Sequence, residues 1–159
     1  MHKLIIAIFS VGALITGFSF YQSQQYDFQT LDGESYQWQT LRGQWVVVNY
    51  FAEWCVPCLQ EVPELNNFYT QYAKPNSVNL FAVSYDSLPA TEVLAIRDKY
   101  NMQFPLLNPE KSDYMPIQKP QYLPATYVIA PDGQISQPLL GEQTSASLIN
   151  AVEQLKQTL

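Results

Sequence analysis

Two apolar runs in the middle of the chain predict its central strands. Residues 45–51 (WVVVNYF) and 78–84 (VNLFAVS) both have the composition of strands that are buried on both faces. Between them, residues 56–73 repeat apolar side chains at helical spacing, which predicts an amphipathic helix. A strand, a helix and a second strand in this order favour parallel pairing through a right-handed crossover.

The rest of the chain is expected to add hairpins and further helices to this core. Pro63 falls inside the first predicted helix and predicts a kink, because proline lacks the N–H of an interior helical residue. Residues 108–122 contain three prolines and mixed charge, and we expect a loop there with at most one helical turn. The other expected elements are a hairpin at 26–36 around Asp32-Gly33, a helix at 88–100, a short extended segment at 104–107, a hairpin formed by 125–130 and 134–140, and a helix at 145–158.

The first residues of the chain differ from the rest. Residues 4–20 form an uncharged apolar run that follows Lys3. The run is near the lower limit of about 17–25 residues for a membrane-spanning helix and is longer than the apolar core of a usual signal peptide. We favour an uncleaved membrane anchor over a cleaved signal peptide, for which Gly17-Phe18-Ser19 is the best cleavage candidate. The positive charge before the run predicts a cytoplasmic N-terminus and a domain outside the cytoplasm.

These patterns divide the chain into an anchor or signal segment, residues 1–21, and one domain, residues 22–159. Whether the segment is kept as an anchor in the cytoplasmic membrane or cleaved on secretion, the domain lies in the periplasm or at the extracytoplasmic face of the membrane. Disulfides persist in that compartment. The composition is 47% hydrophobic, enough for a proper core. A formal net charge of −6 without a basic cluster argues against nucleic acid as a partner.

Both cysteines of the chain lie where the first central strand gives way to the helix. Cys55 and Cys58 are three residues apart on one helical face, so they can form a disulfide with little backbone movement. Cys55 is at or next to the N-cap, where the positive end of the helix dipole favours thiolate over thiol. Cys58 lies one turn further along and is expected to be more shielded. The pair is typical of an attacking thiolate and its resolving partner in thiol–disulfide exchange.

Two other interpretations of the cysteine pair have to be weighed. A structural zinc site needs about four ligands, and the only histidine, His2, lies at the extreme N-terminus. A purely structural disulfide is the better alternative. However, a bridge that closes so short a loop removes little entropy from the unfolded chain. The order of strand, aromatic residue, cysteine pair and helix therefore favours redox chemistry.

The sequence around the cysteines resembles a known family. Residues 54–58 (WCVPC) after a buried strand look like the active site of a thioredoxin fold, and the extension through 58–65 (CLQEVPEL) is similar to the TlpA/ResA/CcmG-like group of membrane-anchored or secreted thioredoxin-like proteins. Further landmarks are 104–107 (FPLL) and 123–135 (LPATYVIAPDGQI), so the resemblance covers roughly residues 26–158. It implies an α/β thioredoxin fold, with a mixed central sheet flanked by helices, an N-terminal β-hairpin and a central insert around 86–122.

The resemblance also implies roles for residues around the cysteines. Leu123-Pro124 stands where the thioredoxin fold keeps a cis-proline facing the cysteine pair, whereas an X-Pro bond is otherwise cis in only about 5–6% of cases. In that geometry the Leu123 backbone would bind an extended substrate, and the proline would keep metal from the thiols. Trp54 is expected to pack beside the reactive thiol, and Pro57 lies between the cysteines. We therefore expect Trp54, Pro57, Leu123 and Pro124 to bind substrate, with no metal or other cofactor.

Glu61 is the candidate proton acceptor. It follows Cys58 by three residues, so it can lean over the same helical face, and the family pattern suggests that it accepts the proton of the resolving thiol. The alternative is an ordinary acidic residue that the helix dipole stabilises. Thioredoxin itself carries a buried aspartate six residues before its first cysteine, and Asn49 stands at that position here. The base is therefore Glu61, Glu53 or water.

We therefore predict an exported, membrane-tethered protein-disulfide oxidoreductase that acts as a reductase. The resemblance implies that a membrane electron donor of the DsbD or CcdA type recharges it, and it suggests cytochrome c maturation or another dedicated reduction as its task. One alternative is a peroxiredoxin-like thiol peroxidase, which shares the fold. Such an enzyme would carry a threonine three residues before its reactive cysteine, where this chain has Ala52. A copper chaperone of the Sco type would need a third residue between its cysteines and a downstream histidine. The remaining alternative is a non-catalytic binding module with an inert disulfide.

Overall fold

The computed structural model describes residues 26–112 and 114–158. The expected anchor or signal segment, residues 1–21, lies outside this range. Within the described part of the chain, no helix is both long and apolar enough to cross a membrane.

The centre of the fold is a mixed four-stranded sheet in the order β4-β3-β6-β7. Its strands are β3 (Val46–Phe51), β4 (Asn79–Ser84), β6 (Ala125–Ile129) and β7 (Leu139–Leu140). β3 pairs in parallel with β4 and antiparallel with β6, and β6 pairs antiparallel with β7. All six residues of β3 are buried, as its apolar composition predicted. The two central strands, their parallel pairing and the second hairpin are therefore confirmed.

The helical region after β3 is more broken than predicted. It consists of α2 (Val56–Gln60), α3 (Val62–Asn67) and a π-helical segment, η1 (Phe68–Ala73). The interruption lies at Glu61, two residues before Pro63, because the proline ring crowds the preceding turn and supplies no N–H to it. In the last turn the amide of Lys74 donates to the carbonyl of Tyr69, five residues back. The predicted kink is thus real, but it begins earlier than proline alone suggested.

A second, three-stranded sheet has the order β2-β1-β5. The expected N-terminal hairpin is formed by β1 (Phe28–Thr30) and β2 (Ser35–Tyr36). The expectation of a loop throughout 108–122 was wrong, because Leu107–Ser112 forms β5, antiparallel to β1. The register shifts between Phe28 and Thr30, so β5 bulges, and a bulge accommodates Pro109, which has no N–H for the ladder.

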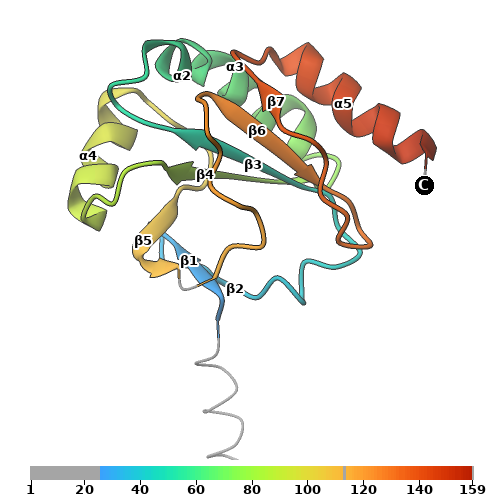
Figure 1. Ribbon diagram of the computed structural model, residues 1–159, viewed down its shortest axis with the longest axis horizontal. Coiled ribbons are helices and arrows are strands. Elements are labelled where there is room, and N and C mark those ends of the chain that lie inside the picture. The colour runs from blue at the N-terminus through green and yellow to red at the C-terminus, as the bar shows by residue number, and fades with distance from the viewer. Residues whose placement is uncertain (1–25, 113, 159) are drawn as a thin grey trace, which may run out of the picture.

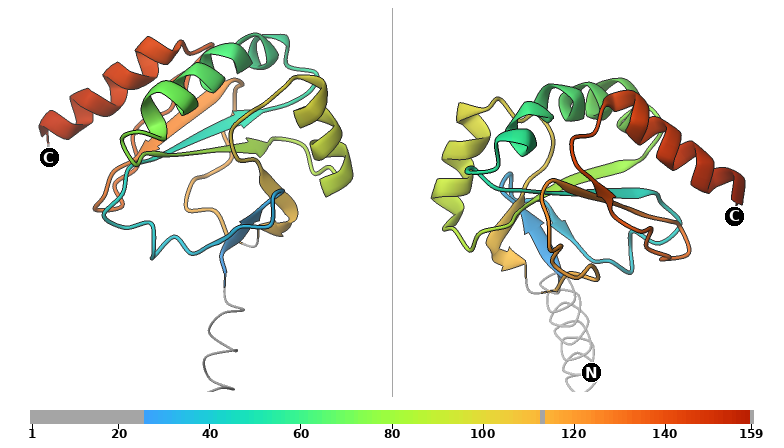
Figure 2. Two further views of the ribbon diagram at one scale, coloured as in Figure 1. Left: turned by 180° about the vertical axis from the view of Figure 1, so that it is seen from behind. Right: turned by 45° about the horizontal axis from the view of Figure 1, so that its top comes forward.

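The four-stranded sheet is covered on both faces. One apolar cluster joins it to the helices, including α4 (Ala90–Lys99) and α5 (Ser145–Thr158). On the other face, Phe28 stacks against Tyr36 and packs edge-on against Phe81 of β4. Figure 1 accordingly shows α2, α3 and α5 above the four-stranded sheet and the small sheet below it, and Figure 2 shows the same layers from two other directions. This mixed sheet with flanking helices is the predicted thioredoxin-like α/β architecture.

Candidate active site

The two cysteines lie at the carboxyl end of β3, where the helical segment begins. They form a disulfide with a Cα–Cα distance of 5.3 Å. Cys55 is the N-cap of α2, and its sulfur accepts a hydrogen bond from the amide of Cys58 at 3.3 Å. The exposed fraction is 5% for Cys55 and 1% for Cys58. The predicted order of exposure is therefore correct, but both sulfur-bearing residues are buried in the disulfide form.

Glu61 is buried close to this disulfide-bearing segment, with only 1% of its surface exposed. One carboxylate oxygen accepts a hydrogen bond from Nδ2 of Asn49 at 2.7 Å, and the other accepts from the amide of Gln143 at 2.9 Å. Asn49 Nδ2 also donates to the hydroxyl of Thr126 on β6 at 3.0 Å. The carboxylate is thus held by groups from β3 and from the segment before α5, which does not fit an ordinary solvated residue of a first helical turn.

Burial raises the pKa of Glu61 from its usual 4.5 to about 7. The hydrogen bonds from Gln143 and Asn49 favour the charged carboxylate and lower the pKa, while the negative charge of Glu142 raises it further. Burial raises the pKa by more than the two hydrogen bonds lower it, because the carboxylate is almost entirely shielded from solvent. Glu61 therefore exchanges its proton near neutral pH.

The start of α5 is fixed against the same helical region. The amide of Ser145 donates to Glu64 at 2.8 Å, next to the contact between Gln143 and Glu61. Thr144 and Ser147 cap the helix reciprocally, each side-chain oxygen accepting the other residue's amide hydrogen bond. Hydrogen bonds to Glu61 and Glu64 thus hold the segment before α5 against the helical region after β3.

Trp54 lies on the surface beside the disulfide, and its exposed fraction is 64%. Its indole N–H donates to the carboxylate of Asp86 at 2.7 Å, and its ring meets Tyr85 edge-on at 6.2 Å between centroids. The Nζ atom of Lys119 lies over the Tyr85 ring, 3.8 Å from its centroid. The indole is therefore directed towards the loop after β4, where partners hold it in place. Glu53, the neighbouring acidic residue, is exposed and pairs with Lys99 at 3.0 Å.

Leu123 and Pro124, which we expect to bind substrate, lie at the same end of the sheet as the two cysteines. The peptide bond between Leu123 and Pro124 is cis, as the resemblance predicted. Ala125 pairs with Tyr50 across the antiparallel ladder, so Pro124 lies opposite the carboxyl end of β3, from which the chain continues to Cys55. Pro57 occupies the first turn of α2 between the cysteines. The expected residues are thus gathered at one edge of the fold.

Sequence reasoning missed the partners that hold these residues. The sequence indicates only that Asn49 cannot transfer protons, whereas the structure shows that its side chain donates to Glu61. A polar side chain within a buried apolar strand signals that a partner must exist, but the sequence does not say which one. The sequence also does not indicate the contacts that Trp54 makes with Asp86 and Tyr85, or the contact of Lys119 with Tyr85. All three residues lie more than thirty positions from Trp54 along the chain.

The fold and the paired cysteines define a class: thioredoxin-fold proteins with a Cys-X-X-Cys disulfide at the start of a helix. A model of the AhpC/TSA family matches residues 21–137, more than half of the chain. The chain therefore belongs to the AhpC/TSA family.

Individual relatives agree with this class. The thiol-disulfide oxidoreductase ResA of Oceanobacillus iheyensis is 31% identical over 118 residues, which are 73% of this chain and 59% of that protein. The thioredoxin-like protein YneN of Bacillus subtilis is 30% identical over 129 residues, 80% of this chain and 74% of that protein. The crystal structure of StoA from Bacillus subtilis shares the fold, with a TM-score of 0.65 at 22% identity over 80% of this chain and 95% of that chain. The predicted relationship to ResA-like proteins is confirmed.

The raised pKa of Glu61 makes stability depend on pH. Folding favours the protonated carboxyl, so this stabilisation is complete below about pH 4.5 and is lost as the pH rises through about 7. Because a change of one in the pKa corresponds to about 1.36 kcal/mol, the free energy of unfolding falls by about 3 kcal/mol between these pH values. Urea unfolding of the oxidised protein from about pH 4 to 8 should show this fall for the wild type, and Glu61→Gln should remove it. Parallel curves for the two proteins would contradict the prediction.

Proposed function

We propose that this protein is an exported thiol–disulfide oxidoreductase that reduces disulfides in other proteins, using Cys55 as nucleophile and Cys58 as resolving thiol. The observation that carries the proposal is the Cys55–Cys58 disulfide at the start of a helical segment, beside a buried carboxyl that titrates near neutral pH. A purely structural bridge has no use for a buried proton acceptor. A redox dithiol does, because its shielded thiol must lose a proton before it can react.

The proposed reaction starts from the reduced protein. The Cys55 thiolate attacks one sulfur of a substrate disulfide, so a Cys55–substrate disulfide forms and the first substrate sulfur leaves as a thiolate. Cys58 then attacks the sulfur of Cys55 and releases the second substrate thiolate. Both released thiolates take up protons. Two electrons and two protons have then passed to the substrate, and the protein holds the Cys55–Cys58 disulfide.

Glu61 is proposed to accept the proton of Cys58 in the second step. Cys58 is 1% exposed, so water cannot easily take its proton. A carboxyl with a pKa of about 7 accepts a proton from a thiol, whose usual pKa is about 8.5, at little cost near neutral pH. The hydrogen bonds from Asn49 and Gln143 keep this carboxyl in place while its charge changes.

Substrate is proposed to bind across Trp54, Pro57 and the Leu123-Pro124 segment. These residues lie at one edge of the fold, and Trp54 offers an exposed, fixed aromatic surface beside the disulfide. The backbone of Leu123 would pair with an extended substrate chain in the manner of an added strand. This arrangement brings the substrate sulfur to the end of the helical segment where Cys55 lies.

The location and the electron supply complete the proposal. Residues 1–21 are proposed to anchor the protein in the cytoplasmic membrane or to direct its secretion, with the domain on the extracytoplasmic side. There a membrane electron donor of the DsbD or CcdA type would return two electrons to the disulfide. Apocytochrome c, whose cysteines must be reduced before haem attachment, is one client that the resemblance suggests.

The reducing direction predicts a low reduction potential. The buried carboxyl of Glu61 and the half-buried carboxylate of Asp86 disfavour negatively charged thiolates and therefore favour the disulfide. Equilibration with glutathione or dithiothreitol buffers, followed by alkylation of the free thiols, should give a potential below about −180 mV. A potential well above that value would indicate an oxidant instead.

The order of the two thiols predicts what Cys58→Ala does. The reduced variant should attack an oxidised model protein such as insulin and accumulate as a covalent mixed disulfide, because no resolving thiol remains. Intact mass spectrometry should show the adduct and its loss on reduction, while the wild type turns over without accumulating it. Cys55→Ala is the matched control and should form no adduct at neutral pH. Equal adduct formation through Cys58 would contradict the assigned order.

The role of Glu61 predicts a pH-dependent defect in the second step. After the reduced protein reacts with Ellman's reagent, the first thionitrobenzoate reports attack by Cys55 and the second reports resolution by Cys58. Near neutral pH, Glu61→Gln should slow the second release by about a hundredfold or more and leave the first within a few fold. The defect should narrow as the pH rises past the pKa of the thiol. A defect that is independent of pH would indicate a structural role only.

A further inference from the structure

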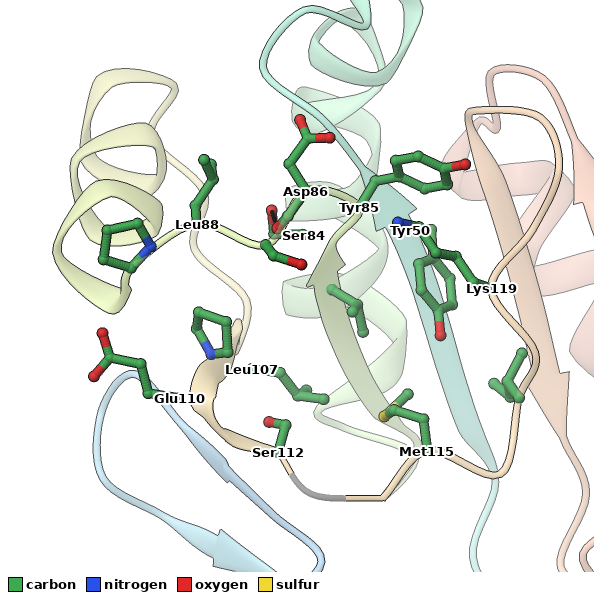
Figure 3. Close-up of a pocket in the computed structure, with 15 residues that line it drawn as sticks. Tyr50, Ser84, Tyr85, Asp86, Leu88, Leu107, Glu110, Ser112, Met115 and Lys119 are labelled. Atoms are coloured by element: carbon green, nitrogen blue, oxygen red, sulfur yellow. Dashed lines mark hydrogen bonds between the residues drawn. The ribbon is translucent and has the colours of Figure 1, made fainter.

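A cavity of about 600 Å³ opens beside the candidate active site, at the carboxyl end of β4. Residues of β3, β4, the loop after β4, β5 and the segment 115–119 line it (Figure 3). In open α/β sheets, ligands bind preferentially outside the carboxyl ends of the strands. The cavity has the size of a ligand site and is larger than packing defects of protein interiors.

The floor of this cavity is apolar. Val83, Leu107, Met115 and Ile117 line it together with the ring of Tyr50. Tyr50 is 4% exposed, and burial raises the pKa of its phenol to about 12. No described residue forms a hydrogen bond with its hydroxyl, which Figure 3 shows directed towards the side of the cavity where Met115 lies. We call this cavity the Tyr50 pocket.

The charged residues at its rim already have partners. Asp86 accepts the indole N–H of Trp54, Glu110 accepts the amide of Ala90 at the start of α4 at 3.1 Å, and Lys119 lies over Tyr85. These contacts engage the charged groups of the rim. What remains unengaged is the apolar floor with one phenol, which favours an apolar occupant with at most one polar atom.

The pocket adjoins both segments that are proposed to hold the substrate. Its rim residues Tyr85 and Asp86 contact Trp54, one residue before the attacking cysteine. Lys119 belongs to the segment that runs on to Leu123 and Pro124. A chain that lies across Trp54 and Leu123 therefore passes the mouth of the pocket.

We propose that the Tyr50 pocket binds a large apolar side chain, preferably aromatic, from the substrate polypeptide within a few residues of the attacked cysteine. An aromatic ring fits best because the Met115 sulfur and the Tyr50 ring both offer favourable contacts to it. The inference rests on the proposed function, since it names the substrate that the same site selects. The two cysteines carry out the exchange with the substrate disulfide, and the Tyr50 pocket selects substrates that carry a large apolar side chain near the attacked cysteine.

Cysteine-centred heptapeptides test this preference. The peptide cysteine is held as a mixed disulfide with thionitrobenzoate, and a single phenylalanine is placed at each other position of an alanine–serine background. The release of thionitrobenzoate by the reduced wild-type protein gives the rate constant of attack. At least one phenylalanine position should raise this constant about tenfold or more over the peptide without phenylalanine. Equal rate constants for all the peptides would overturn the proposal.

Ser87→Trp tests whether the pocket is responsible. Ser87 is an exposed residue of the pocket rim, so an indole there would fill the mouth without disturbing the core. The preference for phenylalanine should fall below about twofold in this variant. Gln154→Trp, on the exposed side of α5, is the matched control and should keep the full preference. An unchanged preference in folded Ser87→Trp would overturn the proposal.

A binding measurement separates the pocket from the thiol chemistry and needs no variant. The oxidised wild-type protein is titrated with N-acetyl-phenylalanine amide and, as a control, N-acetyl-alanine amide, while amide chemical shifts are followed by NMR. Shifts should be caused by the phenylalanine compound alone and centre on residues 83–88 and 115–119. Their absence there would overturn the proposal even if the protein reduces disulfides. Failure to react with Ellman's reagent, with these shifts present, would overturn the redox function and leave the pocket standing.

Discussion

The buried carboxyl of Glu61 is the constraint on which the candidate active site depends. A carboxylate taken out of water costs free energy unless donors replace its hydration. Asn49 on β3 and the amide of Gln143 before α5 supply one donor to each oxygen. One side chain thereby joins the central strand, the break between α2 and α3, and the start of the last helix. Cys58 of the disulfide precedes Glu61 by three residues, about one helical turn from this junction.

The same burial links stability to chemistry. Hydrogen bonds favour the charged form of Glu61, and desolvation favours the neutral form by a larger amount. A carboxyl of this kind lowers the stability of the folded protein at neutral pH, but it can accept a proton from a neighbouring thiol there. Perturbed acids with this combination of burial and specific partners are typical of functional sites. Thioredoxin carries a buried aspartate on this strand, whereas this chain has Asn49 there, which donates to the carboxylate of Glu61 between α2 and α3.

The sequence predicted those features that local composition encodes. The burial of β3 follows from its apolar residues, and the position of Cys55 at a helix start follows from its place after that strand. β5 could not be predicted, because its sequence (LNPEKS) has no alternation of apolar residues and it exists through pairing with β1, far away in the chain. The contacts of Asn49 with Glu61 and of Trp54 with Asp86 are equally non-local. The position of the cysteine pair at a helix start was thus predictable, whereas the partners of Asn49 and Trp54 depend on packing.

The exposed indole of Trp54 lies next to the disulfide, on the surface that we propose to bind substrate. A dithiol recognises a disulfide bond and little else, so any selectivity must come from surfaces around the sulfur. A large aromatic ring on a surface is usually free to move, but this one is fixed by Asp86 and Tyr85. A fixed ring loses little conformational entropy when a substrate packs on it, so more of the contact energy is available for binding. Tyr85 and Asp86 contact this ring and also line the Tyr50 pocket, and we propose that the two surfaces together bind the substrate polypeptide beside Cys55.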